Sequence, residues 1–320
     1  MSRRNVLLCF DAFGTLFYPK PSVPEQYASV ARQCGLVSVT AEQVKKSIKV
    51  AYSAAEKAHP NYGKSTGMGA EKWWTDVIQE TFQLITGSPS EDLPKDLAPR
   101  LLQRFTSSDG YAMAPSVATL LRSIKEQQHR NQRSGPPRIL VGVITNSDDR
   151  VPSVLSSFGL RVSPARFGTH FDPTELAQRQ QSQPYDVDLH CMSYDVGVGK
   201  PDRRIFDAAV RMADELATSA ALVKSAVAEG DADPGHSSWL KIYVGDEYVK
   251  DVVGSREAGW YPVYVGPEDE LPDQERFVSL KQLTHATTFD EAFSKNTSRA
   301  TIRAHSVQEF LEWLLERCTF

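Results

Sequence analysis

The chain contains 320 residues, of which 41% are hydrophobic and 24% are charged. This composition is typical of a globular protein with room for about two domains, and it excludes a mainly disordered or coiled-coil chain. The formal net charge of −4 offers no basic excess for binding a phosphate backbone, so we expect no nucleic-acid partner. No apolar run reaches the roughly 20 residues of a membrane-spanning helix, so we expect no membrane partner and a cytoplasmic or nuclear location.

The first predicted element is a buried strand over Val6–Phe10, an unbroken apolar run too short for the core of a secretion signal. Helical periodicity follows from about residue 23 to residue 106, with four apolar stripes and no strand signal between them. Thr40 and Gln43 predict a capping box that begins the second of these helices, and Gly35 predicts the end of the first. We therefore predict a separate helical domain over residues 19–110.

After residue 110 the pattern changes to alternating strands and helices. Buried strands are predicted over 138–144, 188–193, 240–244, 261–265 and 301–305, with amphipathic helices between them and a last helix after residue 306. This alternation predicts an α/β fold with a doubly wound parallel sheet, built from residues 1–18 and 111–320. Two stretches without periodicity, 161–185 and 223–238, are predicted to be loop insertions.

Polar residues follow the predicted strands, at the edge of the sheet where doubly wound folds bind ligands. They are Asp11 and Thr15, Thr145 and Asn146, Lys200, and Asp246 and Asp251. Together they suit phosphoryl transfer, since a carboxylate can attack phosphorus while a hydroxyl and an ammonium bind the phosphoryl oxygens. The remaining carboxylates suit Mg²⁺, which prefers oxygen ligands. Taken singly, each residue has an ordinary explanation as a helix cap, a turn residue or a solvated side chain. The occurrence of all of them in this order at strand ends favours a catalytic site.

Four segments that carry these residues resemble the motifs of the haloacid dehalogenase-like (HAD) hydrolase superfamily. They read FDAFGTLF at 10–17, VITNS at 143–147, GVGKPDRRIF at 197–206 and YVGDEYVKDVVGSREAG at 243–259. The helical insertion resembles the C1 cap of that superfamily, and PNYGKSTGMGAEKWWTDV at 60–77 resembles its Reg-2-like branch. The resemblance implies a Rossmann-like core with an inserted C1 cap. Because such caps close over the site, it also implies a small phosphorylated molecule as substrate.

The resemblance also implies roles for individual residues. Asp11 would be the nucleophile, with Thr145 and Lys200 holding the phosphoryl group and Thr15 and Asn146 binding substrate beside them. The Mg²⁺ site would comprise Asp11, the backbone carbonyl of Phe13, Asp246 and Asp251. In the cap, Tyr62 and Lys64 lie in a turn-like run that could select substrate, although a hinge beside core tryptophans explains the same run. The oligomeric state is left open.

One position departs from the family's phosphatases, which usually carry a second Asp two residues after the nucleophile as general acid and base. Here that position is Phe13, which cannot transfer a proton. General acid–base catalysis contributes roughly 10²–10⁴-fold, so the sequence predicts a slow Mg²⁺-dependent phosphatase or phosphotransferase. The main alternative is a catalytically impaired HAD fold with a binding or regulatory role. A metal-free 2-haloacid dehalogenase is less favoured, because it has no use for the acidic pair Asp246 and Asp251.

Overall fold

The structure is a computed structural model that describes residues 5–131, 139–227, 239–273, 275–280, 283, 293 and 300–317. The chain divides into two compact units. One comprises residues 1–17, 114–146 and 159–320, and the other comprises residues 18–113 and 147–158.

The first unit is an α/β unit built on a seven-stranded parallel sheet with the strand order β5-β4-β1-β6-β7-β9-β8. Its strands are β1 (Asn5–Phe10), β4 (Ile139–Thr145), β5 (Leu189–Met192), β6 (Trp239–Gly245), β7 (Tyr261–Tyr264), β8 (Phe277–Ser279) and β9 (Thr301–Arg303). Its helices are α5 (Val117–Asn131), α7 (Pro173–Ser182), α8 (Ser193–Val196), α9 (Arg203–Val227), α10 (Gly254–Glu257) and α12 (Val307–Arg317), with the π-helical turn η2 (Tyr248–Val253) and the 3-10 turn η3 (Glu268–Glu270). The predicted doubly wound α/β fold is confirmed.

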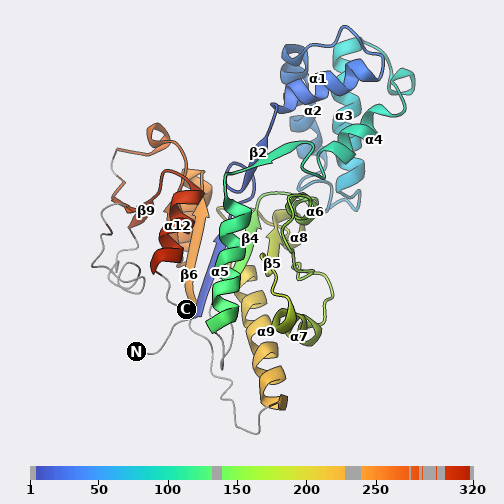
Figure 1. Ribbon diagram of the computed structural model, residues 1–320. Coiled ribbons are helices and arrows are strands. Elements are labelled where there is room, and N and C mark those ends of the chain that lie inside the picture. The colour runs from blue at the N-terminus through green and yellow to red at the C-terminus, as the bar shows by residue number, and fades with distance from the viewer. Residues whose placement is uncertain are drawn as a thin grey trace. The chain divides into compact units, whose positions relative to one another are not determined.

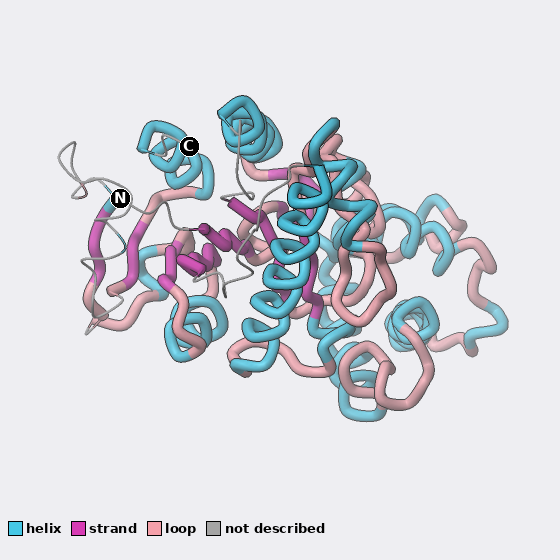
Figure 2. Tube along the Cα trace, turned by 90° about the horizontal axis from the view of Figure 1, so that it is seen from below, coloured by secondary structure: helices cyan, strands magenta, loops and turns pink. Residues whose placement is uncertain are grey.

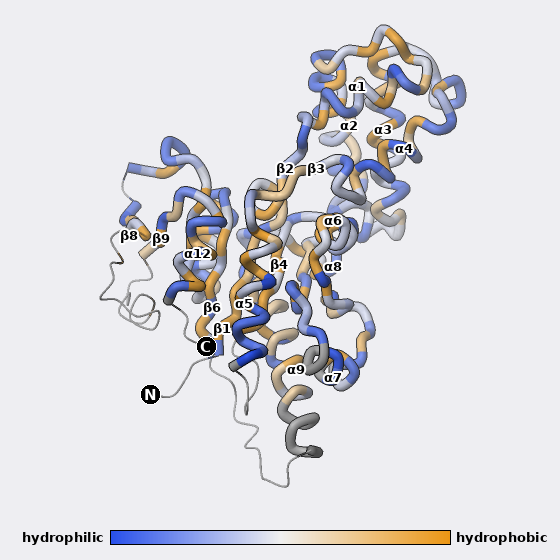
Figure 3. The backbone as a smooth tube through the Cα atoms, in the orientation of Figure 1, coloured by the Kyte–Doolittle hydropathy of each residue, from blue (hydrophilic) through white to orange (hydrophobic). Residues whose placement is uncertain are grey.

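The central strands form the core of this unit. Every residue of β4 is buried, and Figure 3 shows this part of the sheet as strongly hydrophobic. Strand β1 lies between β4 and β6, so that Phe10 pairs with Val143 on one side and with Val244 on the other. This register brings the residues that follow three neighbouring strands to one edge of the sheet. Helix α9 packs against β4 and β5, α5 packs against α12, and Figure 2 shows helices on both sides of the strands.

The second unit is a helical unit whose main elements are coloured blue to cyan-green in Figure 1. It contains α1 (Val23–Gln33), α2 (Ala41–Ala58), α3 (Ala70–Thr86), the 3-10 turn η1 (Ser90–Asp92), α4 (Leu97–Arg104) and α6 (Val151–Ser157), with β2 (Phe17–Pro19) paired to β3 (Tyr111–Met113). The four predicted helices are present. The predicted capping box is formed, because Thr40 Oγ1 accepts the N–H of Gln43 while the Gln43 side chain accepts the N–H of Thr40. Gly35, with φ of +100°, follows α1 as predicted.

Both predicted loop insertions differ from the sequence-based expectation. The stretch 161–185 contains helix α7, which begins where the Asp172 carboxylate accepts the N–H groups of Thr174 and Glu175. Its Leu176 joins the core beside α9, but this sequence stretch shows no helical periodicity that a pattern could detect. In the other stretch, α9 continues to Val227, and residues 228–238 lie outside the described residues.

Residues 147–158, expected in the α/β core, belong to the helical unit instead. The indole N–H of Trp74 donates to Asp148 Oδ2 over 2.6 Å, and the Arg150 guanidinium lies 4.4 Å from the centre of a Trp74 ring. Both contacts join Trp74 to residues more than 70 positions away, which a local pattern cannot reveal. Among the described residues, no helix has both the length and the apolarity required to cross a membrane.

Candidate active site

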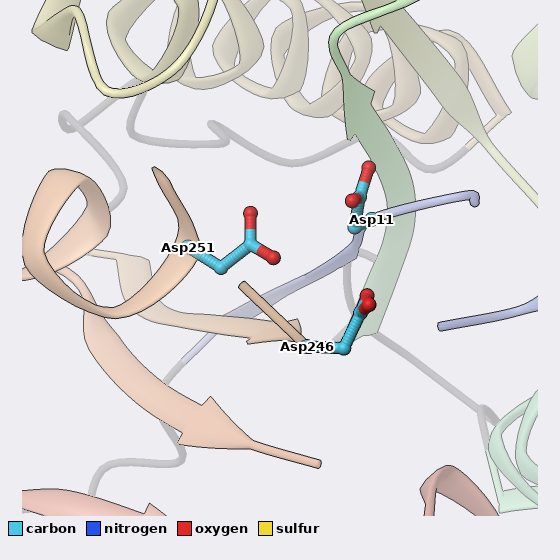
Figure 4. A group of neighbouring side chains, drawn as sticks. All are labelled: Asp11, Asp246 and Asp251. Carbon is cyan, nitrogen blue, oxygen red and sulfur yellow. The ribbon is translucent and has the colours of Figure 1, made fainter. Parts of the chain in front are cut away.

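Three carboxylates meet beyond the ends of two neighbouring strands. Asp11 follows β1, while Asp246 and Asp251 follow β6, and one oxygen of each lies within 4.8 Å of the others. Figure 4 shows the Asp251 side chain directed toward the space beside Asp11 and Asp246. The backbone N–H of Asp11 donates to the carbonyl of Val244 over 2.9 Å, so the β1–β6 ladder itself fixes this convergence.

Two glycines make room for the carboxylates. Gly14 has φ of +84°, and a Cβ on it would lie 2.1 Å from Asp246 Oδ2. A Cβ on Gly245 would lie 2.3 Å from Asp251 Oδ2. Both separations are far inside van der Waals contact, so glycine is required at both positions for the side chains to approach.

Lys200 connects the carboxylates that flank it. Its Nζ lies 2.9 Å from Asp11 Oδ1 and 2.7 Å from Asp251 Oδ1, and its side chain is buried. Burial opposes the charge, but the two carboxylates outweigh it and raise the pKa of Lys200. Lys200 is therefore an ammonium in direct contact with the predicted nucleophile.

The second residue of the acidic pair is held by backbone and by lysine. Asp251 lies in the π-helical turn η2, a rare element that is frequent at functional sites. Its Oδ2 accepts the N–H of Glu247 over 2.9 Å, while its Oδ1 accepts from Lys200. Burial raises the pKa of Asp251 to about 6, with Lys200 lowering it and Asp11 raising it.

The other predicted residues around Asp11 also lie in the α/β unit. Thr15 Oγ1 donates to Asp246 Oδ1 over 2.5 Å, and the buried Thr145 ends β4. The Asn146 amide engages the backbone of Lys200, because its Oδ1 accepts the N–H of Lys200 and its Nδ2 donates to the carbonyl of Lys200. Asn146 thus holds the loop that presents the lysine, and its predicted contact with substrate stays a prediction.

Phe13 lies two residues after Asp11, at the position where the family resemblance predicts a second aspartate. Its ring packs edge-on against Phe17, with ring centroids 4.8 Å apart, and the N–H of the next residue, Gly14, donates to the carbonyl of Phe17. The loop after β1 is therefore ordered around an aromatic contact. The side chain offers no group that could accept or donate a proton.

A family model for haloacid dehalogenase-like hydrolases matches residues 7–223, more than half of the chain. The chain belongs to the haloacid dehalogenase-like hydrolase family. The family expected from the four motifs is thereby confirmed, and with it the hydrolase class.

Relatives of this HAD-like hydrolase have similar lengths. Haloacid dehalogenase-like hydrolase domain-containing protein 3 of Mus musculus is 28% identical over 298 residues, which cover 90% of this chain and 96% of the relative. An uncharacterized hydrolase of Schizosaccharomyces pombe is 26% identical over 258 residues, which cover 81% and 89%. A solved 2-haloacid dehalogenase from Pseudomonas syringae shares the fold, with a TM-score of 0.50 at 17% identity and coverage of 98% and 100%.

The predicted cap residues of this hydrolase lie in the helical unit, within a backbone turn of positive φ. Asn61 and Tyr62 have φ of 53° and 55°, a conformation that is rare outside glycine and concentrates at functional sites. The Tyr62 ring packs against Trp73 and Trp74, at centroid distances of 5.3 Å and 6.1 Å, and Lys64 is exposed. Trp73 is fully buried, as expected of a core tryptophan. A role for Tyr62 and Lys64 in substrate selection stays a prediction.

The acidic cluster fits a hard divalent cation. Its donors are carboxylate oxygens, which Mg²⁺ prefers. Burial raises the pKa of Asp246, as does the negative charge of Asp11, although the Thr15 hydroxyl lowers it. A cation beside these carboxylates would relieve that repulsion. Asp251 differs from the other two, since its two oxygens accept hydrogen bonds from Lys200 and from the N–H of Glu247, which hold it in place beside them.

Proposed function

We propose that this HAD-like hydrolase is a Mg²⁺-dependent phosphohydrolase or phosphotransferase that acts on a small phosphorylated molecule through an aspartyl-phosphate at Asp11. The observation that carries the proposal is the contact of the buried Lys200 ammonium with Asp11, beside the acidic cluster at the ends of β1 and β6. A cationic partner orients Asp11 and offsets the charge of an incoming phosphate. Mg²⁺ bound by Asp11, the Phe13 carbonyl, Asp246 and Asp251 would add further charge stabilisation.

The residues present supply the first half of such a reaction. Asp11 Oδ1 is held by the N–H of Ala12 and by Lys200, so we assign the attack on phosphorus to Oδ2. A bond forms between Oδ2 and phosphorus while the bond to the leaving oxygen breaks, and Lys200 and Thr145 bind the phosphoryl oxygens. In the second half, water attacks phosphorus, the bond to Asp11 breaks and phosphate leaves.

Proton transfer is where Phe13 limits the reaction. The leaving oxygen must depart without a proton from position 13, and the attacking water receives no help from a carboxylate there. The proposed activity is therefore restricted to good leaving groups such as acyl phosphates and aryl phosphates of acidic phenols. The same observation favours the second candidate function, a HAD fold that binds a phosphorylated ligand without turning it over.

A panel of substrates distinguishes the candidates. Wild-type protein and Asp11→Asn are given acyl, aryl and alkyl phosphates and 2-haloacids, with and without Mg²⁺, and phosphate and halide are measured separately. We expect phosphate from the acyl and aryl phosphates, only with Mg²⁺ and only from wild type. Halide release without Mg²⁺ would indicate a dehalogenase. Phosphate release by Asp11→Asn at the wild-type rate would contradict the role of Asp11, and binding without release would favour the second candidate.

A further inference from the structure

Next to Lys200 lies Tyr243, the first residue of the fourth motif segment, to which the motif assigns no role. Tyr243 belongs to β6, three residues before Asp246, and its side chain is fully buried. Its hydroxyl accepts a hydrogen bond from Lys200 Nζ over 2.8 Å and donates one to the carbonyl of Ile144, in β4, over 2.7 Å. The Tyr243 side chain thus links β6 to β4, the two strands that flank β1 in the sheet.

The Lys200 ammonium has one oxygen contact for each of its N–H groups. Lys200 Nζ carries three N–H groups, and three oxygens lie within 2.9 Å of it, on Asp11, Asp251 and Tyr243. The two carboxylates pull the ammonium in competing directions, and the shorter of the two distances is the one to Asp251. Tyr243 supplies the third contact, which restricts the movement of Nζ between the two carboxylates.

The surroundings of the tyrosine fix both its position and its protonation. Its ring packs edge-on against Phe206 and Trp260, at centroid distances of 5.2 Å and 6.4 Å. Burial raises the pKa of Tyr243 well above its ordinary value, with Asp251 and Asp11 adding to the effect, so the hydroxyl keeps its proton. That proton is directed to Ile144, which leaves a lone pair for the ammonium.

We propose that Tyr243 is a positioning residue that holds the Lys200 ammonium against Asp11, an inference that rests on the proposed function. Phenylalanine at this position would keep the ring packing and remove one acceptor. The ammonium would then move toward Asp251, because its distance to Asp251 Oδ1 is already shorter than its distance to Asp11 Oδ1. Asp11 would lose part of the positive charge that orients it and that stabilises the phosphoryl group in the transition state.

The test compares two tyrosine-to-phenylalanine variants in the same core. Tyr185 belongs to the hydrophobic cluster that contains Tyr243, and its buried hydroxyl has no hydrogen-bond partner among the described residues. With an aryl phosphate and Mg²⁺, Tyr243→Phe should lower kcat about tenfold, the loss expected for one hydrogen bond to a charged group, with KM changed less than about twofold. Tyr185→Phe should leave both constants near the wild-type values. An unchanged kcat in Tyr243→Phe, or an equal loss in both variants, would overturn the proposal.

A second measurement does not depend on turnover or on metal. In ¹⁵N-labelled protein, the Lys200 ammonium should give a slowly exchanging Nζ signal, assigned by its absence from Lys200→Met. Tyr243→Phe should exchange these protons with water several-fold faster, and Tyr185→Phe should not. If wild type releases no phosphate from any substrate, the proposed function fails, and this signal still decides whether Tyr243 holds the lysine. An exchange rate unaffected by Tyr243→Phe would overturn the inference.

Discussion

The side chain at position 13 determines which leaving groups the proposed reaction tolerates. Phe13 lies two residues after Asp11 in the same short loop, and its ring contacts Phe17. A carboxylate at this position would be attached close to the nucleophile. Without it, the rate depends on how readily the leaving oxygen departs as an anion. This dependence is a property of one residue and can be tested by changing that residue alone.

Replacing the ring by a carboxylate should restore proton transfer. Phe13→Asp is expected to raise the turnover of an alkyl phosphate by about tenfold or more, within the range that general acid–base groups contribute. Turnover of an aryl phosphate with an acidic phenol should change much less. Phe13→Asn provides the control, because its amide cannot supply the proton. Equal wild-type rates on both substrates, with no gain in Phe13→Asp, would show that another residue supplies the proton.

His190 gives a prediction about stability. It is buried in β5, its Nε2 lies 2.6 Å from the carbonyl of Ser163, and burial lowers its pKa from 6.5 to about 4. Because the pKa is lower in the folded state, its contribution to stability is complete above the unfolded value and is lost as the pH falls from 6.5 toward 4. Between about pH 7 and about pH 5, wild type should lose about 2 kcal/mol more unfolding free energy than His190→Gln. Equal losses in urea titrations would contradict the shift.

At the scale of elements, a buried ion pair joins a helix to the sheet. Lys125 of α5 contacts Asp188, next to β5, over 2.7 Å and donates to the carbonyl of Ile139 in β4. The Asp188 carboxylate also accepts the N–H of Val141. One lysine thereby fixes α5 to the ends of two strands.

Removal of that lysine should destabilise the α/β unit. Lys125→Met leaves the Asp188 charge buried without its cation, which costs about 3 kcal/mol or more. Lys46→Met, which breaks the exposed pair with Glu42, should change the unfolding free energy by less than about 1 kcal/mol. Urea denaturation of the three proteins measures both effects. A Lys125→Met variant as stable as Lys46→Met would show that the buried pair contributes little.

The elements also show what the sequence could predict. Strands β1 and β4 are almost entirely apolar, and β6 is apolar apart from Lys241. The ends of these strands, and Asp11, Thr145 and Asp246 at those ends, could therefore be located by pattern. The contact of Tyr243 with Lys200 could not be predicted from the sequence, because it depends on how β6 and the Gly199–Pro201 loop align in space. In the sequence of β6, Tyr243 resembles the other buried strand residues. Helix α7 was not predicted, because its sequence has no helical periodicity, although Asp172 caps its start and Leu176 packs into the core.

At the scale of the whole molecule, the family motifs extend over most of the chain, and the helical insertion separates the first from the second. The order of strands and the convergence of the acidic residues follow from that arrangement. The extent of the helical unit does not follow from the motifs. Residues 147–158 belong to that unit, where Asp148 contacts Trp74, a residue far away in the sequence. Sequence reasoning thus predicts which residues meet at the sheet edge better than it predicts where one unit ends.

Mg²⁺ should stabilise the whole molecule against heat. A ligand that binds only the folded state raises the unfolding free energy, by about 2.7 kcal/mol at a hundredfold excess over its dissociation constant. Millimolar Mg²⁺ should therefore raise the melting temperature of wild type by several degrees. It should leave Asp246→Asn unchanged, whereas Asp207→Asn, altered on the exposed side of α9, should respond like wild type. Equal shifts in wild type and Asp246→Asn would place the cation elsewhere.

The proposed reaction requires that Asp11 become phosphorylated during turnover, and trapping the phosphorylated enzyme tests this requirement directly. Wild type is mixed with Mg²⁺ and an aryl phosphate, quenched in acid after a few turnovers and digested for mass spectrometry. Because position 13 provides no base for the second step, the aspartyl-phosphate should accumulate. We expect one phosphoryl group on Asp11 in wild type and none in Asp11→Asn. Phosphate release by wild type with Asp11 unmodified, or with the phosphoryl group on another residue, would contradict it.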